Sequence, residues 1–90
     1  MLALDELAEC LASPGGVERQ IEERELIECM NRFLRTLPDT QRQIFICRYW
    51  YMSSIEEIAE KFKFSRSKIT SMLFRTRKKL QTVLRKENLL

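Results

Sequence analysis

The sequence predicts an all-α fold, a small domain of four to five helices that ends in a long C-terminal helix. Its 90 residues include only two glycines and two prolines, so few positions favour a turn. Apolar residues recur every three or four positions, as they do on one face of a helix, and no segment shows the alternation typical of a strand. Apolar residues make up 44% and charged residues 32% of the chain, which favours a compact domain over a disordered segment.

A short N-terminal segment is set apart by its composition. Residues 3–12 carry a helical stripe of leucines, and a Ser-Pro-Gly-Gly run at residues 13–16 ends it, because proline and glycine interrupt helices. We therefore expect residues 1–16 to form an arm or linker and residues 17–90 to form the domain.

The next two helices are expected to meet at a proline. Apolar residues spaced by three and four, from Leu26 to Leu37, predict a helix over about residues 17–36. That helix should stop at Leu37, because the residue before a proline disfavours the helical conformation. Asp39 is the expected N-cap of the following helix, over about residues 40–51.

The last two helices are expected to begin at serines. Ser54 and Glu57 have the spacing of a capping box, and the helix that follows has an inward apolar face that includes the small Ala59. Ser65 is the expected N-cap of a long helix that reaches about Glu87. The apolar arc of this long helix consists of Ile69, Met72, Leu73, Thr76, Leu80, Val83 and Leu84.

Charge is distributed unevenly along the chain. Residues 61–90 contain ten lysines and arginines and one acid, a formal charge of +9. Residues 1–60 contain six basic and twelve acidic residues, a formal charge of −6. A positive helix that follows a short turn is typical of elements that enter the major groove of DNA and neutralise phosphates.

The segment from Ser54 to Lys79 is therefore a candidate helix-turn-helix, with Ala59 at the helix crossing and Phe64 as the apolar plug of the turn. The second helix begins with short polar and basic side chains that suit base edges, namely Arg66, Ser67, Lys68, Thr70 and Ser71. Phosphate contact is expected from Arg75, Arg77, Lys78 and Lys79. Phe74 lies on the same polar arc, where we favour packing against a neighbouring helix over contact with a thymine methyl group.

Several short motifs follow one another in a characteristic order along the chain. They are Leu37-Pro38, Arg42, Arg48-Tyr49, the Ser54–Ala59 segment, Ser65, Ile69 and the Leu73–Leu80 segment. Together they resemble region 4 of bacterial RNA polymerase sigma factors of the extracytoplasmic-function type. The resemblance covers about residues 19–86.

The resemblance implies a helical domain that recognises the promoter −35 element in double-stranded DNA through the second helix of its motif. It also implies docking on the β flap of the RNA polymerase core, and masking by an anti-sigma factor as a further partner. By this resemblance Arg66, Ser67, Thr70 and Ser71 face bases, whereas Lys68, Arg75 and Arg77 lie nearer the backbone and Arg48 is a further phosphate contact.

Two departures from the family pattern affect these expectations. Lys63 stands where the family often has glycine. A residue with a Cβ atom at positive φ costs on the order of 1 kcal/mol, so the turn is open to a different conformation here. The chain also has no region 2, the part of a sigma factor that recognises the −10 element, so we do not expect it to start transcription alone.

Other classes of function find little support. The chain has no histidine, no glycine-rich phosphate loop and no CxxC pair, so we expect no enzyme, no metal site and no cofactor. Cys10, Cys29 and Cys47 are expected to be reduced thiols. Because there is neither a secretory signal nor an apolar run long enough for a membrane span, we expect the bacterial cytoplasm.

Two alternatives stay open. One is a helical interaction module that binds an anti-sigma factor or polymerase and little DNA, which the acidic first 60 residues favour. The other is the output domain of a LuxR-like response regulator, against which the Leu37-Pro38 lead-in and the Arg-x-Arg-Lys end argue.

Overall fold

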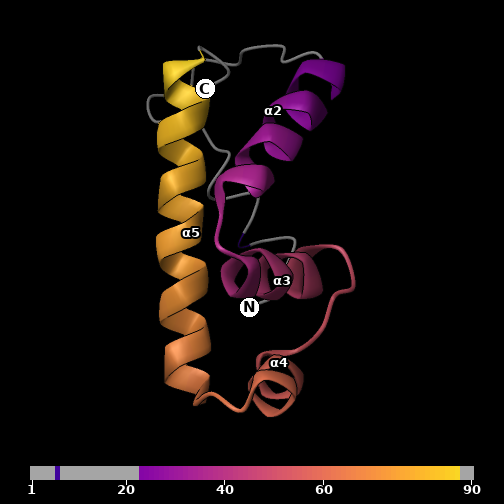
Figure 1. The fold of residues 1–90 in the computed structure, drawn as a ribbon, viewed down its shortest axis with the longest axis vertical. Coiled ribbons are helices and arrows are strands. Elements are labelled where there is room, and N and C mark those ends of the chain that lie inside the picture. The colour runs from indigo at the N-terminus through magenta and orange to yellow at the C-terminus, as the bar shows by residue number, and fades with distance from the viewer. Residues whose placement is uncertain (1–5, 7–22, 88–90) are drawn as a thin grey trace.

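The structure, a computed structural model, describes Glu6 and residues 23–87. Within these residues the chain forms four α-helices and no strand (Figure 1). They are α2 (Glu23–Thr36), α3 (Asp39–Tyr49), α4 (Ile55–Phe62) and α5 (Arg66–Lys86). The predicted all-α class with a long C-terminal helix is confirmed. The expected arm and its helix over residues 3–12 lie outside the described residues, apart from Glu6.

Helix α5 is the spine of the fold. It runs the length of the molecule in Figure 1, with α4 beside its first turns, α3 beside its middle and α2 beside its second half. Five residues of its predicted apolar arc are buried, and Met72 and Val83 are partly buried. They pack against Ile44 and Phe45 of α3 and Ile58 of α4 in one shared core. The hydroxyl of the buried Thr76 donates to the Met72 carbonyl at 2.8 Å, so its polar atom is satisfied inside that core.

Helix α3 differs from the prediction at both ends. Asp39 is not its N-cap: Pro38 holds that position, and Asp39 is the first helical residue, where its exposed carboxylate pairs with Arg42. Proline has no backbone N–H and suits an extended conformation, so the chain enters the helix one residue earlier than expected. The helix ends at Tyr49, and Met52 takes φ 55° in the turn that leads to α4.

The turn between α4 and α5 keeps the expected helix-turn-helix form. The capping box is confirmed: Ser54 Oγ accepts from the Glu57 N–H at 3.1 Å, and the Glu57 carboxylate accepts from the Ser54 N–H at 3.0 Å. Lys63 adopts the left-handed conformation, φ 59° and ψ 40°, in which glycine is most at ease. Ser65 caps α5 by accepting from the Lys68 N–H at 3.1 Å. Ser54 and Lys63 therefore mark the two ends of α4, and Ser65 marks the start of α5.

Candidate nucleic-acid interface

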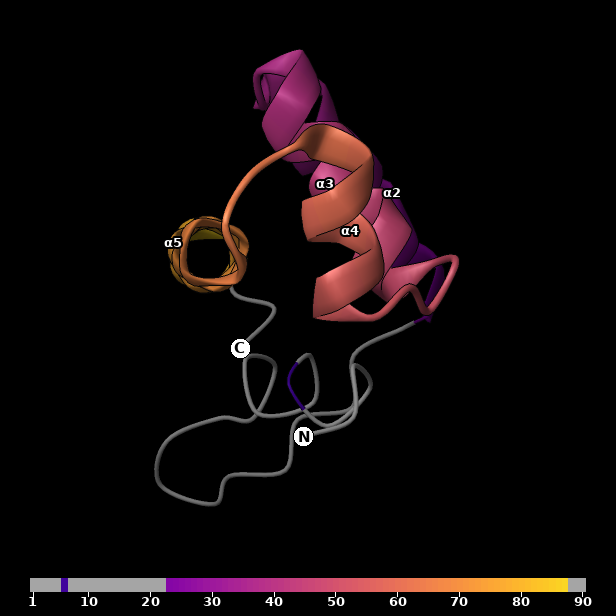
Figure 2. The ribbon, with the colours of Figure 1, turned by 90° about the horizontal axis from the view of Figure 1, so that it is seen from below.

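The first turns of α5 present polar side chains to solvent. Arg66, Ser67, Thr70 and Ser71, the four residues predicted to face bases, are all exposed. Figure 2 looks along α5, and α2, α3 and α4 all lie to one side of it. The Thr70 hydroxyl donates to the Arg66 carbonyl at 2.9 Å, which leaves its oxygen lone pairs directed outward. These residues form a surface that can meet base edges.

Arg66 stands at the entrance to this surface and pairs with a carboxylate of α4. Its Nη1 lies 3.3 Å from Glu56 Oε1, and the two side chains are 70% and 65% exposed. The pKa of Glu56 is lowered, first by a hydrogen bond from its own backbone N–H and then by the one from Arg66. An exposed pair of this kind stabilises little, so Arg66 is easily released to another acceptor.

Phe74 lies on the same face, and its packing against a neighbouring helix is not observed. Its side chain is 52% exposed, with Arg77 and Lys78 over its ring at 5.9 Å and 5.4 Å from the centroid. It lines a shallow hollow together with Thr70, Ser71, Arg75 and Arg77. Phe74 therefore adds an apolar patch in the middle of a cationic surface.

One flank of α5 carries three cations. Lys68, Arg75 and Lys79 lie about one or two turns apart and line a second hollow, which the Gln41 side chain of α3 closes. The Lys68 ammonium lies 3.9 Å from the centroid of the Phe64 ring, a cation–π contact that fixes its direction. Lys78 is exposed on the outward face between the two hollows. Of the six predicted backbone contacts, Lys68, Arg75, Lys78 and Lys79 are thus accessible.

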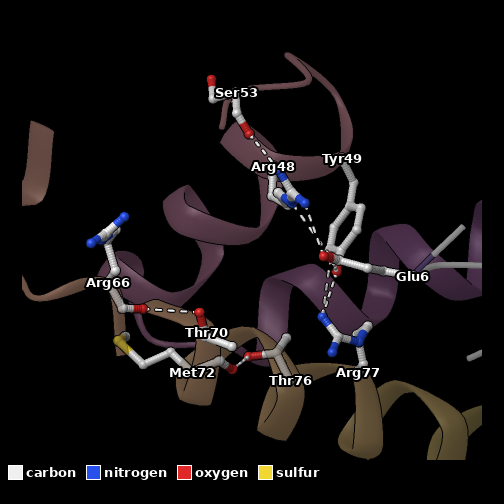
Figure 3. A network of polar contacts seen from close by, with 9 residues as sticks. All are labelled: Glu6, Arg48, Tyr49, Ser53, Arg66, Thr70, Met72, Thr76 and Arg77. Atoms are coloured by element: carbon white, nitrogen blue, oxygen red, sulfur yellow. Dashed lines mark hydrogen bonds and ion pairs between the residues drawn. The ribbon is translucent and has the colours of Figure 1, made fainter. Parts of the chain in front are cut away.

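The other two predicted backbone contacts, Arg48 and Arg77, turn inward to the carboxylate of Glu6 (Figure 3). Arg48 Nη2 lies 2.9 Å from Glu6 Oε1, and Arg77 Nη1 lies 3.4 Å from Glu6 Oε2. The Tyr49 hydroxyl donates to Glu6 Oε2 at 3.0 Å and accepts from Arg77 Nη1 at 2.7 Å. Arg48 also donates to the Ser53 carbonyl at 3.0 Å. The side chains of Arg48, Arg77 and Glu6 are only 9%, 18% and 14% exposed.

The environment of this network shifts two pKa values. Burial tends to raise the pKa of Glu6, but hydrogen bonds from Arg48 and Tyr49 and the charges of both arginines outweigh it, so the pKa falls below 4.5. Burial raises the pKa of Tyr49 to about 12, against the opposing effect of Arg77 and with a smaller contribution from Glu6. Glu6 is therefore an anion and Tyr49 a neutral donor at neutral pH.

Sequence reasoning did not find Glu6 and Tyr49 as partners of the two arginines. Glu6 is 42 residues from Arg48 and 71 residues from Arg77, and no periodic pattern links positions so far apart. The one available signal was the division of charge between an acidic first part and a basic last part of the chain, which predicts attraction between the two parts but no particular pair of residues.

No other chemistry is assembled in the described residues. Residues 23–87 and Glu6 contain no cluster of three His, Cys, Asp or Glu side chains that could hold a metal ion. Cys29 and Cys47 are buried free thiols, whereas Cys10 is outside the described part of the chain. None of the helices described here has the length and apolar character that crossing a membrane requires.

Comparison with known proteins gives one match. The protein-family model described as sigma-70, region 4 matches residues 27–80, which run from Ile27 of α2 to Leu80 of α5 and include the predicted helix-turn-helix segment from Ser54 to Lys79. No curated protein and no solved structure shows significant similarity to the chain.

Proposed function

Since the chain belongs to the sigma-70 region 4 family, whose members are DNA-binding domains of sigma factors, we propose that it recognises the promoter −35 element and docks on the RNA polymerase core. The observation that carries the proposal is the exposed start of α5. This is the second helix of a capped helix-turn-helix, the other three helices lie to one side of it (Figure 2), and Arg66, Ser67, Thr70 and Ser71 are exposed.

Base recognition is proposed for the outward face of the first turns. Arg66 can donate two hydrogen bonds to the acceptors of guanine, and Ser67, Thr70 and Ser71 can each donate or accept. Their exposure allows these contacts without any rearrangement of the core. Phe74 extends this face with an apolar surface that suits a thymine methyl group.

Backbone contact is proposed for Lys68, Arg75 and Lys78. These cations lie beside the base-facing residues, where the phosphates of a major groove pass on either side of an inserted helix. The free N–H groups at the start of α5 add a favourable dipole toward an anion. The second hollow, lined by Lys68, Arg75 and Lys79, is a suitable place for a phosphate group.

Docking on the β flap of RNA polymerase, and masking by an anti-sigma factor, are proposed from membership of the family alone. The interaction-module alternative predicts little DNA affinity, and the exposed cationic face of α5 argues against it. A LuxR-like output domain is not supported, because the family model that matches the helix-turn-helix is that of sigma region 4.

The test is DNA binding by fluorescence anisotropy, with duplexes selected from a randomised pool. The affinity should fall with salt at a slope of roughly −0.9 per neutralised phosphate in a plot of log K against log salt concentration. We expect Arg66→Ala to relax base preference at one or two positions by roughly 1–3 kcal/mol. Lys78→Ala should weaken all sequences alike and reduce the slope by about one phosphate.

Arg24→Ala is the matched control. Arg24 is also an exposed arginine paired with a glutamate, at 3.6 Å from Glu28, but it lies on α2. Its loss should change neither base preference nor salt slope. If Arg66→Ala selects the same sequences with the same affinities as Arg24→Ala, the assignment of α5 as the base-reading helix is wrong.

A further inference from the structure

Two arginines from different helices converge on one anion. Arg48 comes from α3 and Arg77 from α5, and the Tyr49 hydroxyl stands between them (Figure 3). Arg48 is held in place from behind by the Ser53 carbonyl. Two guanidinium groups that are this close and this little exposed repel each other unless an anion lies between them. The arrangement is thus a preformed binding site for one oxyanion, to which three side chains can donate hydrogen bonds.

We propose that this site holds the Glu6 carboxylate in the free protein and a phosphate of the DNA backbone in the complex, so that Glu6 competes with DNA for Arg48 and Arg77. The inference rests on the proposed function, because it takes a duplex to lie along α5. It goes beyond that function because it assigns to Glu6 the role of an intramolecular competitor of the DNA phosphates.

The chemistry of the site suits either ligand. A carboxylate and a phosphodiester each present two anionic oxygens at similar spacing, and a guanidinium group can donate to both in parallel. Arg48 already uses both Nε and Nη2 on the two oxygens of Glu6, at 3.4 Å and 2.9 Å. The Tyr49 hydroxyl, which is protonated at neutral pH and whose pKa burial raises to about 12, supplies a further donor.

The anion site lies next to the surface of α5 that is proposed to bind DNA. Arg77 lines the same hollow as Thr70, Ser71 and Phe74, so the anion site adjoins the base-facing surface on one side of α5. The cations Lys68 and Lys79 line the hollow on the other side, and Arg75 lines both hollows. Within the described residues those three cations form no ion pair with an acid. A duplex can therefore engage one flank directly, but it gains the other flank only when Glu6 leaves.

The first test is Glu6→Gln, which removes the charge and keeps the shape of the side chain. Affinity for a duplex selected from the randomised pool is measured by anisotropy at low salt, after circular dichroism has shown that the variant is folded. We expect roughly tenfold tighter binding, the effect of no longer displacing one charge-assisted contact. Glu25→Gln, at an exposed position of α2, makes the same change in net charge and should bind within about twofold of the wild type.

A double-mutant cycle separates competition from a general gain in charge. Arg77→Ala should weaken binding strongly in the Glu6→Gln background, where the Glu6 carboxylate no longer competes with phosphate for Arg77, and weakly in the wild type, where its phosphate contact is offset by the lost contact with Glu6. Equal effects of Arg77→Ala in both backgrounds, or equal affinities of Glu6→Gln and Glu25→Gln, would overturn the inference while leaving the proposed function intact.

A second readout follows Glu6 itself. Carbon-13 NMR titration of its carboxyl group should give a pKa below 4.5 in the free protein and a pKa that moves back toward 4.5 when the duplex is saturating. An unchanged pKa in a duplex complex refutes the competition. If no variant binds any duplex at low salt, the proposed function fails first and the inference fails with it.

Discussion

A lysine occupies the left-handed position of the turn between α4 and α5. Lys63 has φ 59° and ψ 40°, and its side chain is exposed. For a residue with a Cβ atom this conformation costs about 1–2 kcal/mol, and glycine avoids that cost. Glycine also gives the unfolded chain more conformational entropy, which lowers the stability of the folded state by about 0.4–1 kcal/mol and offsets part of this gain. We therefore expect Lys63→Gly to raise the free energy of unfolding by about 0.5–1 kcal/mol.

Urea unfolding followed by circular dichroism measures this gain. With a slope near 1 kcal/mol per molar urea, as for other small domains, the midpoint should rise by roughly 0.5–1 M at constant slope. Lys63→Ala is the control, because it removes the same side chain but keeps the Cβ atom, so it should not be stabilised. If Lys63→Gly is no more stable than Lys63→Ala, the left-handed turn is not strained and the reasoning is refuted.

Three further predictions concern the acid of the arm, the helix cap and the buried thiol. The pKa of Glu6 is lower in the folded protein than in the unfolded chain, so the ionised carboxylate stabilises the folded state above about pH 4.5. This stabilisation is lost as pH falls through the folded-state pKa. The difference in unfolding free energy between the wild type and Glu6→Gln should therefore shrink in a series of measurements toward low pH. Ser54→Ala should cost about 1 kcal/mol in urea unfolding through loss of the capping box, and Ser54→Thr should restore most of it. Burial, followed by the nearby Glu87, raises the pKa of Cys29 to about 11, so a thiol reagent at pH 8 should label it only after unfolding; rapid labelling of the folded protein would contradict the burial.

The parts of the fold that the sequence predicts well are those encoded within one or two helical turns. The Ser54–Glu57 capping box and the Ser65 cap each involve residues three positions apart. The buried arc of α5, from Ile69 to Leu84, follows from a period of 3.6 residues. Such signals depend on backbone geometry that any helix shares, so they can be recognised without knowledge of the tertiary structure.

The errors arise where a competing local preference or a neighbouring helix decides the outcome. Asp39 has the right chemistry for an N-cap, but Pro38 takes the cap position and shifts Asp39 into the first turn. Ile27 fits the apolar stripe of α2, yet it is 51% exposed because it lies at the edge of that stripe, whereas Leu26 and Met30 pack in the core. Phe74 was expected to pack on a neighbour, and its direction depends on which side of α5 the other helices cover.

The accessible charge of α5 also differs from its formal charge, and this difference bears on function. The last third of the chain carries +9, but Arg66 pairs with Glu56 and Arg77 shares Glu6 with Arg48. These two acids differ in how easily DNA can replace them. The Arg66 pair is more than half exposed and stabilises little, whereas the Glu6 network is shielded from water, where the same Coulomb attraction is stronger.

It follows that the two kinds of contact are expected to form in order. Arg66 can leave Glu56 at little cost, so base contacts at the start of α5 can form while Glu6 still holds its arginines. Arg48 and Arg77 join only when the backbone of a well-seated duplex offers a phosphate in place of Glu6. A poorly matched sequence, which seats α5 less deeply, gains only the flank of Lys68, Arg75 and Lys79. The cost of displacing Glu6 therefore falls on well-seated complexes and not on loosely seated ones, so Glu6→Gln should widen the affinity ratio between selected and random duplexes.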